Sequence, residues 1–114
     1  MRIAITGTHG SGKTTLVEDF LAEHPRYRHV VEPYEALTDA GAVFSDPPTV
    51  ADHVEQLERS IASLHDNAGV ADVIFERCPL DFLAYIGVLA RRSGEDGFDV
   101  GASRDEVAEA LAVL

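Results

Sequence analysis

The stretch GTHGSGKT, from Gly7 to Thr14, constrains this chain more than any other feature of its sequence. It follows the pattern G-x-x-x-x-G-K-[ST], in which glycines let successive backbone N–H groups turn inward and surround an anionic phosphate. A helix that begins directly after the loop adds the partial positive charge of its N-terminus. A glycine-rich turn without a ligand is the alternative, and the apolar run before the loop and the helical pattern after it disfavour that alternative.

The pattern also predicts which residues contact a nucleotide. Lys13 would reach the β- and γ-phosphates of a nucleoside triphosphate, and the hydroxyl of Thr14 would bind Mg²⁺. His9 stands at a position that the pattern leaves open, so we expect it to act as a spacer within the loop. The residues predicted to contact the nucleotide are Gly7, Thr8, His9, Gly10, Ser11, Gly12, Lys13, Thr14 and Thr15.

Short apolar runs alternate with helical patterns along the chain. Strands are predicted at 2–6, 29–31 and 72–75, and helices at 13–24, from 50 to about 67–69, at 80–92 and from 103 onward. Residues 34–48 are predicted as a loop in which Asp46 caps the next helix, residues 93–102 as a polar linker, and Ser103 to Glu106 as a capping box. This α/β alternation predicts a parallel sheet with helices on both faces.

Polar residues follow the second and third predicted strands. Glu32-Pro33 ends one and Glu76-Arg77 ends the other, and in a parallel sheet both would face the same crevice as Lys13. A carboxylate there can hold Mg²⁺ or accept a proton from an attacking hydroxyl, and an arginine can neutralise phosphate oxygens. Structural salt bridges are the alternative for all three side chains.

The aromatic residues near these strand ends are Tyr34, Phe82 and Tyr85. We expect them in the core or in the wall of the crevice. His24, His29, His53 and His65 show no metal-ligand spacing, and Cys78 is interpreted as a small residue before Pro79.

Composition narrows the class of protein. The chain has 114 residues and a net charge of −11, which suits one small domain and argues against binding nucleic-acid polymers. Its one cysteine excludes an internal disulfide and suits a reducing cytosol. No apolar stretch is long enough to span a membrane and the N-terminus lacks the layout of a signal peptide, so a soluble, cytoplasmic protein is expected.

Together, the stretches ITGTHGSGKTTL, VVEPYEAL and VIFERCPLDFLAY resemble P-loop kinase-like AAA-type ATPases related to the ribosylnicotinamide kinase domain, with a second resemblance to deoxynucleoside kinases. The resemblance implies a three-layer α/β/α fold and the cofactors ATP and Mg²⁺. It implies that Glu32 is the base that activates a nucleoside hydroxyl, that Glu76 lies on the Mg²⁺ side, and that Arg77 contacts phosphate. Cys78 stands where the deoxynucleoside kinases have serine.

The resemblance covers most of the first 90 residues. Such proteins continue with two further strands, a lid that carries arginine, and an adenine-binding loop. We therefore expect residues 1–114 to form an incomplete P-loop domain of about three strands, whose open sheet edge is covered by another chain, as in a homo-oligomer, or by the rest of a longer product. The expected function is ATP-dependent phosphoryl transfer to a small nucleoside-like acceptor. The alternatives are a regulatory or vestigial ATP-binding module and a structural fragment without a ligand.

Overall fold

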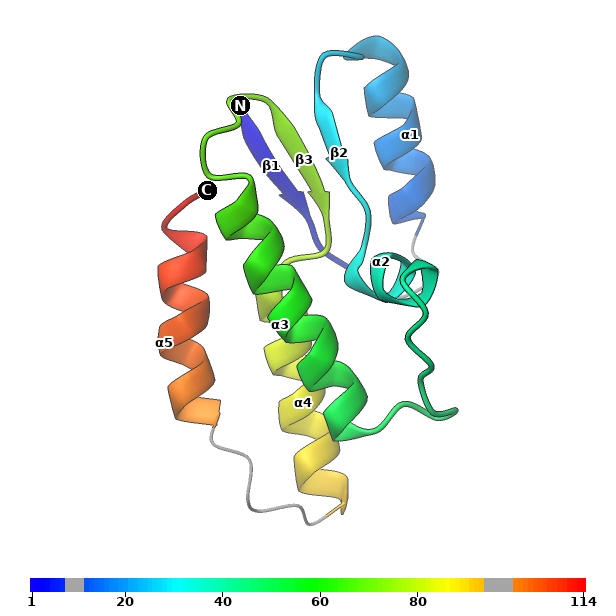
Figure 1. Cartoon of the computed structure of the whole chain (residues 1–114), viewed down its shortest axis with the longest axis vertical. Coiled ribbons are helices and arrows are strands. Elements are labelled where there is room, and N and C mark those ends of the chain that lie inside the picture. Colours follow the sequence, from blue (N-terminus) through cyan, green and yellow to red (C-terminus); the bar gives the residue numbers. More distant parts are fainter. Residues whose placement is uncertain (8–11, 94–99) are drawn as a thin grey trace.

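The computed structural model describes residues 1–7, 12–93 and 100–114 of the chain. Strands and helices alternate through these residues, as the sequence predicts (Figure 1). They follow one another in the order β1 (Arg2–Ile5), α1 (Lys13–Glu23), β2 (Arg28–Val30), α2 (Pro33–Asp39), α3 (Val50–Asp66), β3 (Val73–Glu76), α4 (Pro79–Ser93) and α5 (Val100–Leu111). Each predicted strand is present within one or two residues of its expected bounds.

The strands form a parallel sheet in the order β1-β3-β2. Ile74 at the centre of β3 pairs with Ile3 on one side and with His29 on the other. All of β3 is buried, as expected for an unbroken apolar run that is covered on both faces. The carboxyl ends of the three strands lie together, so segments that are distant in sequence meet at one edge of the sheet (Figure 1).

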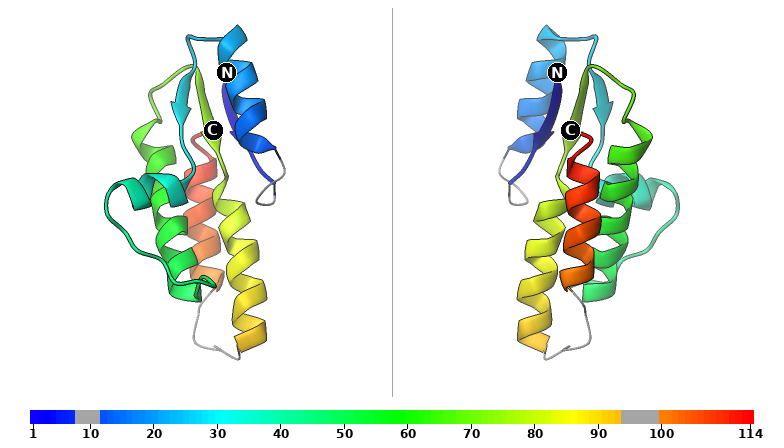
Figure 2. Two further views of the ribbon diagram at one scale, coloured as in Figure 1. Left: turned by 90° about the vertical axis from the view of Figure 1, so that its right-hand side faces the viewer. Right: turned by 90° about the vertical axis from the view of Figure 1, so that its left-hand side faces the viewer.

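Helices cover both faces of the sheet, which gives the predicted three-layer arrangement (Figure 2). α1 packs on one face, where Val17 is completely buried. α3 and α5 cover the opposite face, where Leu64 and Ala110 form an apolar cluster with Val73 and Phe75. The sheet is therefore held between two helical layers.

A second apolar cluster lies among α3, α4 and α5, which extend beyond the carboxyl ends of the strands (Figure 1). It is built from Leu57, Phe82, Ile86 and Val107. Full burial of an apolar side chain of this size stabilises a fold by roughly 1.5–3 kcal/mol. The cluster thus fixes the three helices next to the strand ends.

The prediction of a loop over residues 34–48 is wrong in its first half, because Pro33–Asp39 forms α2. Proline is well suited to the first position of a helix, where its fixed φ fits and its missing N–H is not needed. The backbone N–H of Ala36 donates to the carbonyl of Glu32 at 3.1 Å, which closes the first turn. Pro33 therefore keeps Glu32 in extended geometry and at the same time begins a helix.

The predicted cap of α3 is also wrong, because Thr49 and not Asp46 is the N-cap residue. The Thr49 hydroxyl accepts a hydrogen bond from the Asp52 N–H at 3.2 Å, and the Asp52 carboxylate accepts one from the Thr49 N–H at 2.9 Å. These two bonds form a reciprocal capping box. The bond from the Thr49 N–H lowers the pKa of Asp52, because it stabilises the charged form of the carboxylate.

The last helix begins earlier than predicted. α5 starts at Val100, so Ser103 lies inside the helix and not at its cap, and residues 100–102 do not belong to a linker. Val107 and Ala110 are buried against the neighbouring elements, and such packing outweighs a local capping signal. The remainder of the predicted linker, 94–99, lies outside the described residues.

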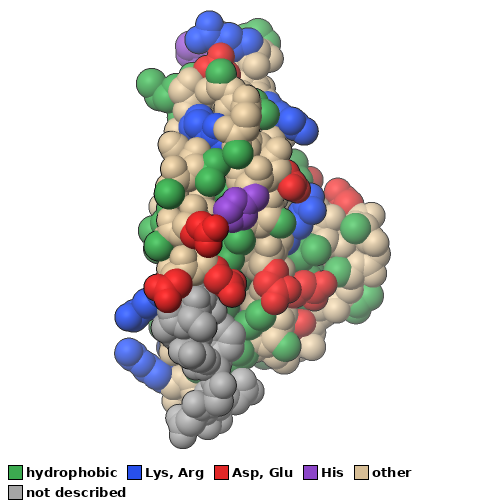
Figure 3. All heavy atoms as spheres, turned by 60° about the vertical axis from the view of Figure 1, so that its left-hand side comes forward, with side chains coloured by type: hydrophobic (Ala, Val, Ile, Leu, Met, Phe, Trp, Pro, Cys, Tyr) green, Lys and Arg blue, Asp and Glu red, His purple; other side chains and the backbone are tan. Residues whose placement is uncertain are grey.

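Acidic side chains dominate the middle of the face shown in Figure 3, in keeping with the net charge of −11. An anionic ligand must therefore be held by local groups and not by the overall charge of the protein. Within the described ranges, no helix is both long enough and apolar enough to cross a membrane.

Candidate functional site

The described ends of the glycine-rich loop adopt backbone conformations that glycine favours. Gly7 has a φ of 146° and Gly12 a φ of 85°, in the region that L-residues seldom adopt. Gly12 is also the N-cap of α1, and its carbonyl accepts a hydrogen bond from the Leu16 N–H at 3.0 Å. The loop therefore leads directly into a helix N-terminus. The predicted contacts at Thr8, His9, Gly10 and Ser11 lie outside the described residues.

Lys13, Thr14 and Thr15 form the first turn of α1. Lys13 is only 8% exposed, which is uncommon for a lysine side chain. Thr14 and Thr15 are both exposed. The ammonium of Lys13 lies close enough to Asp81 to lower the pKa of that carboxyl. A buried cation thus stands at the start of the helix, where a phosphate would be bound.

Glu76, at the carboxyl end of β3, is held from both sides. One carboxylate oxygen lies 2.7 Å from Nε2 of His29 on β2, and the other accepts a hydrogen bond from the Thr14 hydroxyl at 3.4 Å. Glu76 is 3% exposed. The structure therefore brings together the two residues predicted to face Mg²⁺, and it adds His29, for which the sequence analysis assigned no role.

Arg77 follows directly and has a φ of 79°. This left-handed conformation is uncommon for a residue with a side chain. The Arg77 N–H donates to the carbonyl of Ile5 at 2.8 Å, and the guanidinium donates to the carbonyl of Gly7 at 2.8 Å. Both contacts tie Arg77 to the segment that leads into the glycine-rich loop.

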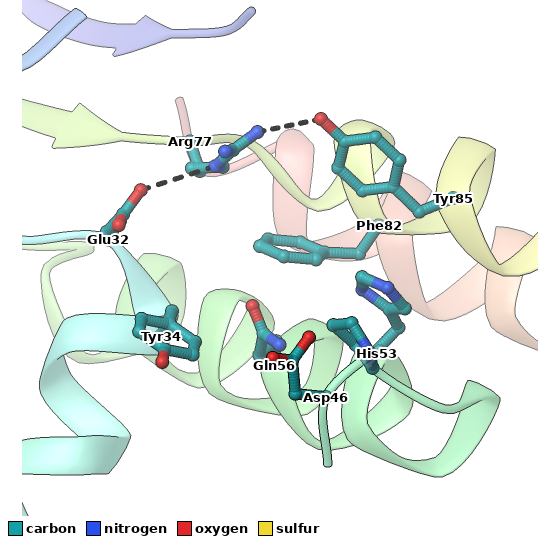
Figure 4. Close-up of a pocket in the computed structure, with 9 residues that line it drawn as sticks. Glu32, Tyr34, Asp46, His53, Gln56, Arg77, Phe82 and Tyr85 are labelled. Carbon is teal, nitrogen blue, oxygen red and sulfur yellow. Dashed lines mark hydrogen bonds and ion pairs between the residues drawn. The ribbon is translucent and has the colours of Figure 1, made fainter. Parts of the chain in front are cut away.

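The guanidinium of Arg77 also joins the ends of β2 and β3 to α4. Its Nε lies 3.4 Å from a carboxylate oxygen of Glu32, and another of its nitrogens donates to the Tyr85 hydroxyl at 3.0 Å (Figure 4). The Asp81 carboxylate is 4.0 Å away. Because the Arg77 side chain is nearly buried, these partners compensate for its lost hydration.

Asp81, in the first turn of α4, is a site residue that the sequence analysis missed. Burial raises the pKa of its carboxyl, while the hydrogen bond from the Cys78 N–H and the positive charges of Arg77 and Lys13 lower it. The signal was present in the sequence, since Asp81 stands four positions after Arg77 at the start of a helix.

Burial also raises the pKa of the Cys78 thiol and keeps it protonated, in agreement with a packing role.

A pocket of roughly 710 Å³ opens beside Glu32 and Arg77 (Figure 4). Tyr34, Phe82 and Tyr85 line it, so the prediction that they form the core or the crevice wall is confirmed. The remaining lining residues are Asp46, Pro48, His53 and Gln56. A pocket of this volume, largely apolar with a few polar groups, is typical of a site for a small organic molecule.

His53 and Gln56 were not predicted as pocket residues. They lie three residues apart near the start of α3 and so share one face of that helix. The sequence signal for both residues was their position, because His53 and Gln56 are polar and lie beside the apolar stripe formed by Val50, Val54 and Leu57.

The chain matches the family model described as an AAA domain over residues 2–109, which is nearly its whole length. A search of curated proteins and one of solved structures each gave no significant match. The family agrees with the glycine-rich loop and with the three-stranded parallel sheet, which corresponds to an incomplete P-loop NTPase fold. The chain therefore belongs to the AAA domain family of nucleotide-binding P-loop proteins.

Proposed function

We propose that this protein transfers the γ-phosphoryl group of Mg-ATP to a hydroxyl group of a small nucleoside-like molecule. The observation that carries the proposal is the position of the pocket. It opens at the Glu32–Arg77 pair, and Arg77 also contacts Gly7 at the start of the phosphate-binding loop. An acceptor in the pocket would therefore lie next to the end of a triphosphate held by the loop.

The residues around Glu76 suit Mg²⁺. Thr14 and Glu76 offer a hydroxyl and a carboxylate oxygen, and Mg²⁺ prefers oxygen ligands and retains several of its waters. When bound, the ion would neutralise charge on the β- and γ-phosphate oxygens. Glu76 would hold it with Thr14, and His29 would keep the carboxylate oriented.

The other residues would act on the acceptor and on the transferring group. The Glu32 carboxylate would accept the proton of the acceptor hydroxyl as its oxygen attacks the γ-phosphorus. The bond between that phosphorus and the β,γ-bridging oxygen breaks, and ADP leaves with the electron pair. Lys13 and Arg77 would stabilise the negative charge on the phosphate oxygens, because cations in a partly buried site interact strongly with it.

The first test is the thermal unfolding midpoint with and without millimolar Mg-ATP, for the wild type, Lys13→Ala and the control Arg91→Ala. Arg91 is an exposed cation in the last turn of α4, so the control removes the same charge away from the site. Ligand at one hundred times its dissociation constant stabilises by about 2.7 kcal/mol, which shifts the midpoint of a small domain by several degrees. We expect this shift in the wild type and in Arg91→Ala, and its loss in Lys13→Ala.

The second test is transfer of radiolabelled γ-phosphate from ATP to each of the common nucleosides. Labelled nucleoside monophosphate supports the proposal. A shift with Mg-ATP that depends on Lys13, together with no labelled product, would instead indicate a module that binds ATP without acting as a kinase.

A further inference from the structure

Asp46 is a carboxylate in the wall of the pocket that has no part in capping α3, since Thr49 is the N-cap. Within the described residues, its carboxylate makes no hydrogen bond and no ion pair. Asp46 is exposed, so water solvates it. An organic molecule that fills the pocket displaces part of this water, and that displacement costs free energy unless the molecule offers hydrogen-bond donors in return.

The segment that carries Asp46 is held in place on both sides. The Ser45 N–H donates to the carboxylate of Asp52 at 3.1 Å, which ties the segment to the first turn of α3. The ring of Phe44 stacks on that of Tyr34 from α2, with centroids 5.4 Å apart and planes inclined by 28°. The carboxylate is therefore positioned before a ligand arrives, which lowers the entropy lost on binding.

No cation in the described wall of the pocket is available to neutralise Asp46. Figure 4 shows Asp46 across the pocket from Arg77, whose charge is already opposed by Glu32 at 3.4 Å and by Asp81 at 4.0 Å. Burial lowers the pKa of the His53 ring, which is therefore mainly neutral at pH 7. This side of the pocket thus favours a ligand group that donates hydrogen bonds and disfavours an anionic one.

We propose that Asp46 determines acceptor specificity by accepting hydrogen bonds from an amino group on the acceptor's heterocycle. This inference rests on the proposed function, because it takes the pocket as the acceptor site. The acceptor would place its hydroxyl at Glu32 and its amino group at Asp46. Its planar ring would pack between these ends against the aromatic residues of the wall, which are Tyr34, Phe82 and Tyr85.

A carboxylate at this position distinguishes heterocycles by a simple rule. It has only acceptor oxygens, so it pairs with an amino group and is repelled by a carbonyl oxygen in the same place. A site that is built to pair with a polar group of its ligand discriminates strongly against the analogue that lacks this group. Asp46 would therefore favour the amino-bearing member of two otherwise similar nucleosides.

The test uses three such pairs, which are guanosine and inosine, adenosine and purine riboside, and cytidine and uridine. Calorimetry measures the dissociation constant of each nucleoside for the wild type, Asp46→Asn and Asp46→Ala. In at least one pair, we expect the wild type to bind the amino-bearing member roughly tenfold more tightly, because hydrogen bonds to a charged group are among the strong ones. Both Asp46 variants should bind the two members of that pair with nearly equal affinity.

Asp39→Asn is the matched control. Asp39 is an exposed aspartate at the end of α2 and lies outside the wall of the pocket, so this variant removes the same charge from a neighbouring position. It should keep the wild-type preference in every pair. Mg-ATP affinity, measured in each variant, reports whether the fold is retained.

Failure of the inference is distinguishable from failure of the proposed function. The role of Asp46 is overturned if the wild type shows no preference in any pair, or if its preference persists in Asp46→Ala. It is also overturned if none of these nucleosides binds to wild-type protein that binds Mg-ATP. Phosphoryl transfer is judged separately, by the labelled-phosphate assay. If the preference depends on Asp46 and no nucleoside is phosphorylated, the specificity role stands and the transfer reaction does not.

Discussion

The imidazole of His29 lies 2.7 Å from one carboxylate oxygen of Glu76, while the Thr14 hydroxyl contacts the other oxygen. The three residues come from β2, β3 and the first turn of α1, which are separate in sequence. Glu76 is therefore held from two sides, and under the proposed function it is a ligand of Mg²⁺. Groups that orient a metal ligand from behind tune the affinity for the metal, even though they do not touch it.

The first prediction concerns this contact. Replacing His29 by alanine should raise the Mg²⁺ concentration needed for half-maximal ATP binding by roughly tenfold, because Glu76 loses its orientation. Titration of Mg²⁺ at fixed ATP, followed by calorimetry, measures the effect. His65→Ala is the matched control, since His65 is exposed near the end of α3. Superimposable Mg²⁺ titrations of His29→Ala and His65→Ala would show that His29 has no such role.

The second prediction concerns the backbone at Arg77. Its φ of 79° strains any residue with a Cβ, whereas glycine adopts this conformation readily. Arg77→Gly should therefore be more stable than Arg77→Ala by about 1 kcal/mol, although both lose the same side-chain contacts. Urea unfolding measures the difference. Equal unfolding midpoints in the two variants would contradict the assignment of strain to this position.

The architecture could be predicted from the sequence because each of its main elements has a strong local signal. The unbroken Val-Ile-Phe run identified the buried central strand, and the glycine-rich loop fixed the junction between β1 and α1. The parallel topology then followed from the alternation of strands and helices. It brought Glu32, Glu76 and Arg77 to one edge, as predicted.

The pocket could not be predicted in the same way, because its polar wall depends on tertiary packing. His53 carries no motif, and its place beside Tyr85 arises from the contact between α3 and α4. Asp81 likewise acquires its raised pKa only from burial, which outweighs the opposing effect of Arg77 and Lys13. The error at the start of α3 has a local cause. Asp46 and Thr49 are both acceptable caps, and hydrogen bonding with Asp52 decides between them.

The third prediction concerns the pH dependence of stability through Asp81. Burial raises the pKa of its carboxyl above the ordinary value of 3.8, so the folded protein retains a proton that the unfolded chain has lost. Stability therefore falls as pH rises through the interval between these two pKa values, and the loss persists at neutral pH. Asp81→Asn should be more stable than the wild type at pH 7, and this advantage should shrink as pH falls through the interval toward 3.8.

Urea unfolding at a series of pH values from about 3.5 to about 7 measures this difference. Asp105→Asn is the control, because Asp105 is exposed on α5. An Asp81→Asn variant that is less stable than the wild type at pH 7 would mean that the contact between Asp81 and Arg77 outweighs the cost of burying the carboxylate.

The last prediction separates the pocket from the core that supports it. Phe82 and Ile86 lie one turn apart on α4 and belong to the same buried cluster, but only Phe82 also lines the pocket. Phe82→Leu and Ile86→Val each remove part of a buried side chain, and each should destabilise the fold by about 1 kcal/mol. Phe82→Leu should in addition weaken nucleoside binding by roughly tenfold, because the loss of a stacked aromatic ring costs about 1 kcal/mol or more. Ile86→Val should bind nucleosides as the wild type does. If the two variants lose affinity equally, the loss reflects a general loosening of the helical cluster, and the aromatic wall of the pocket does not bind the ring.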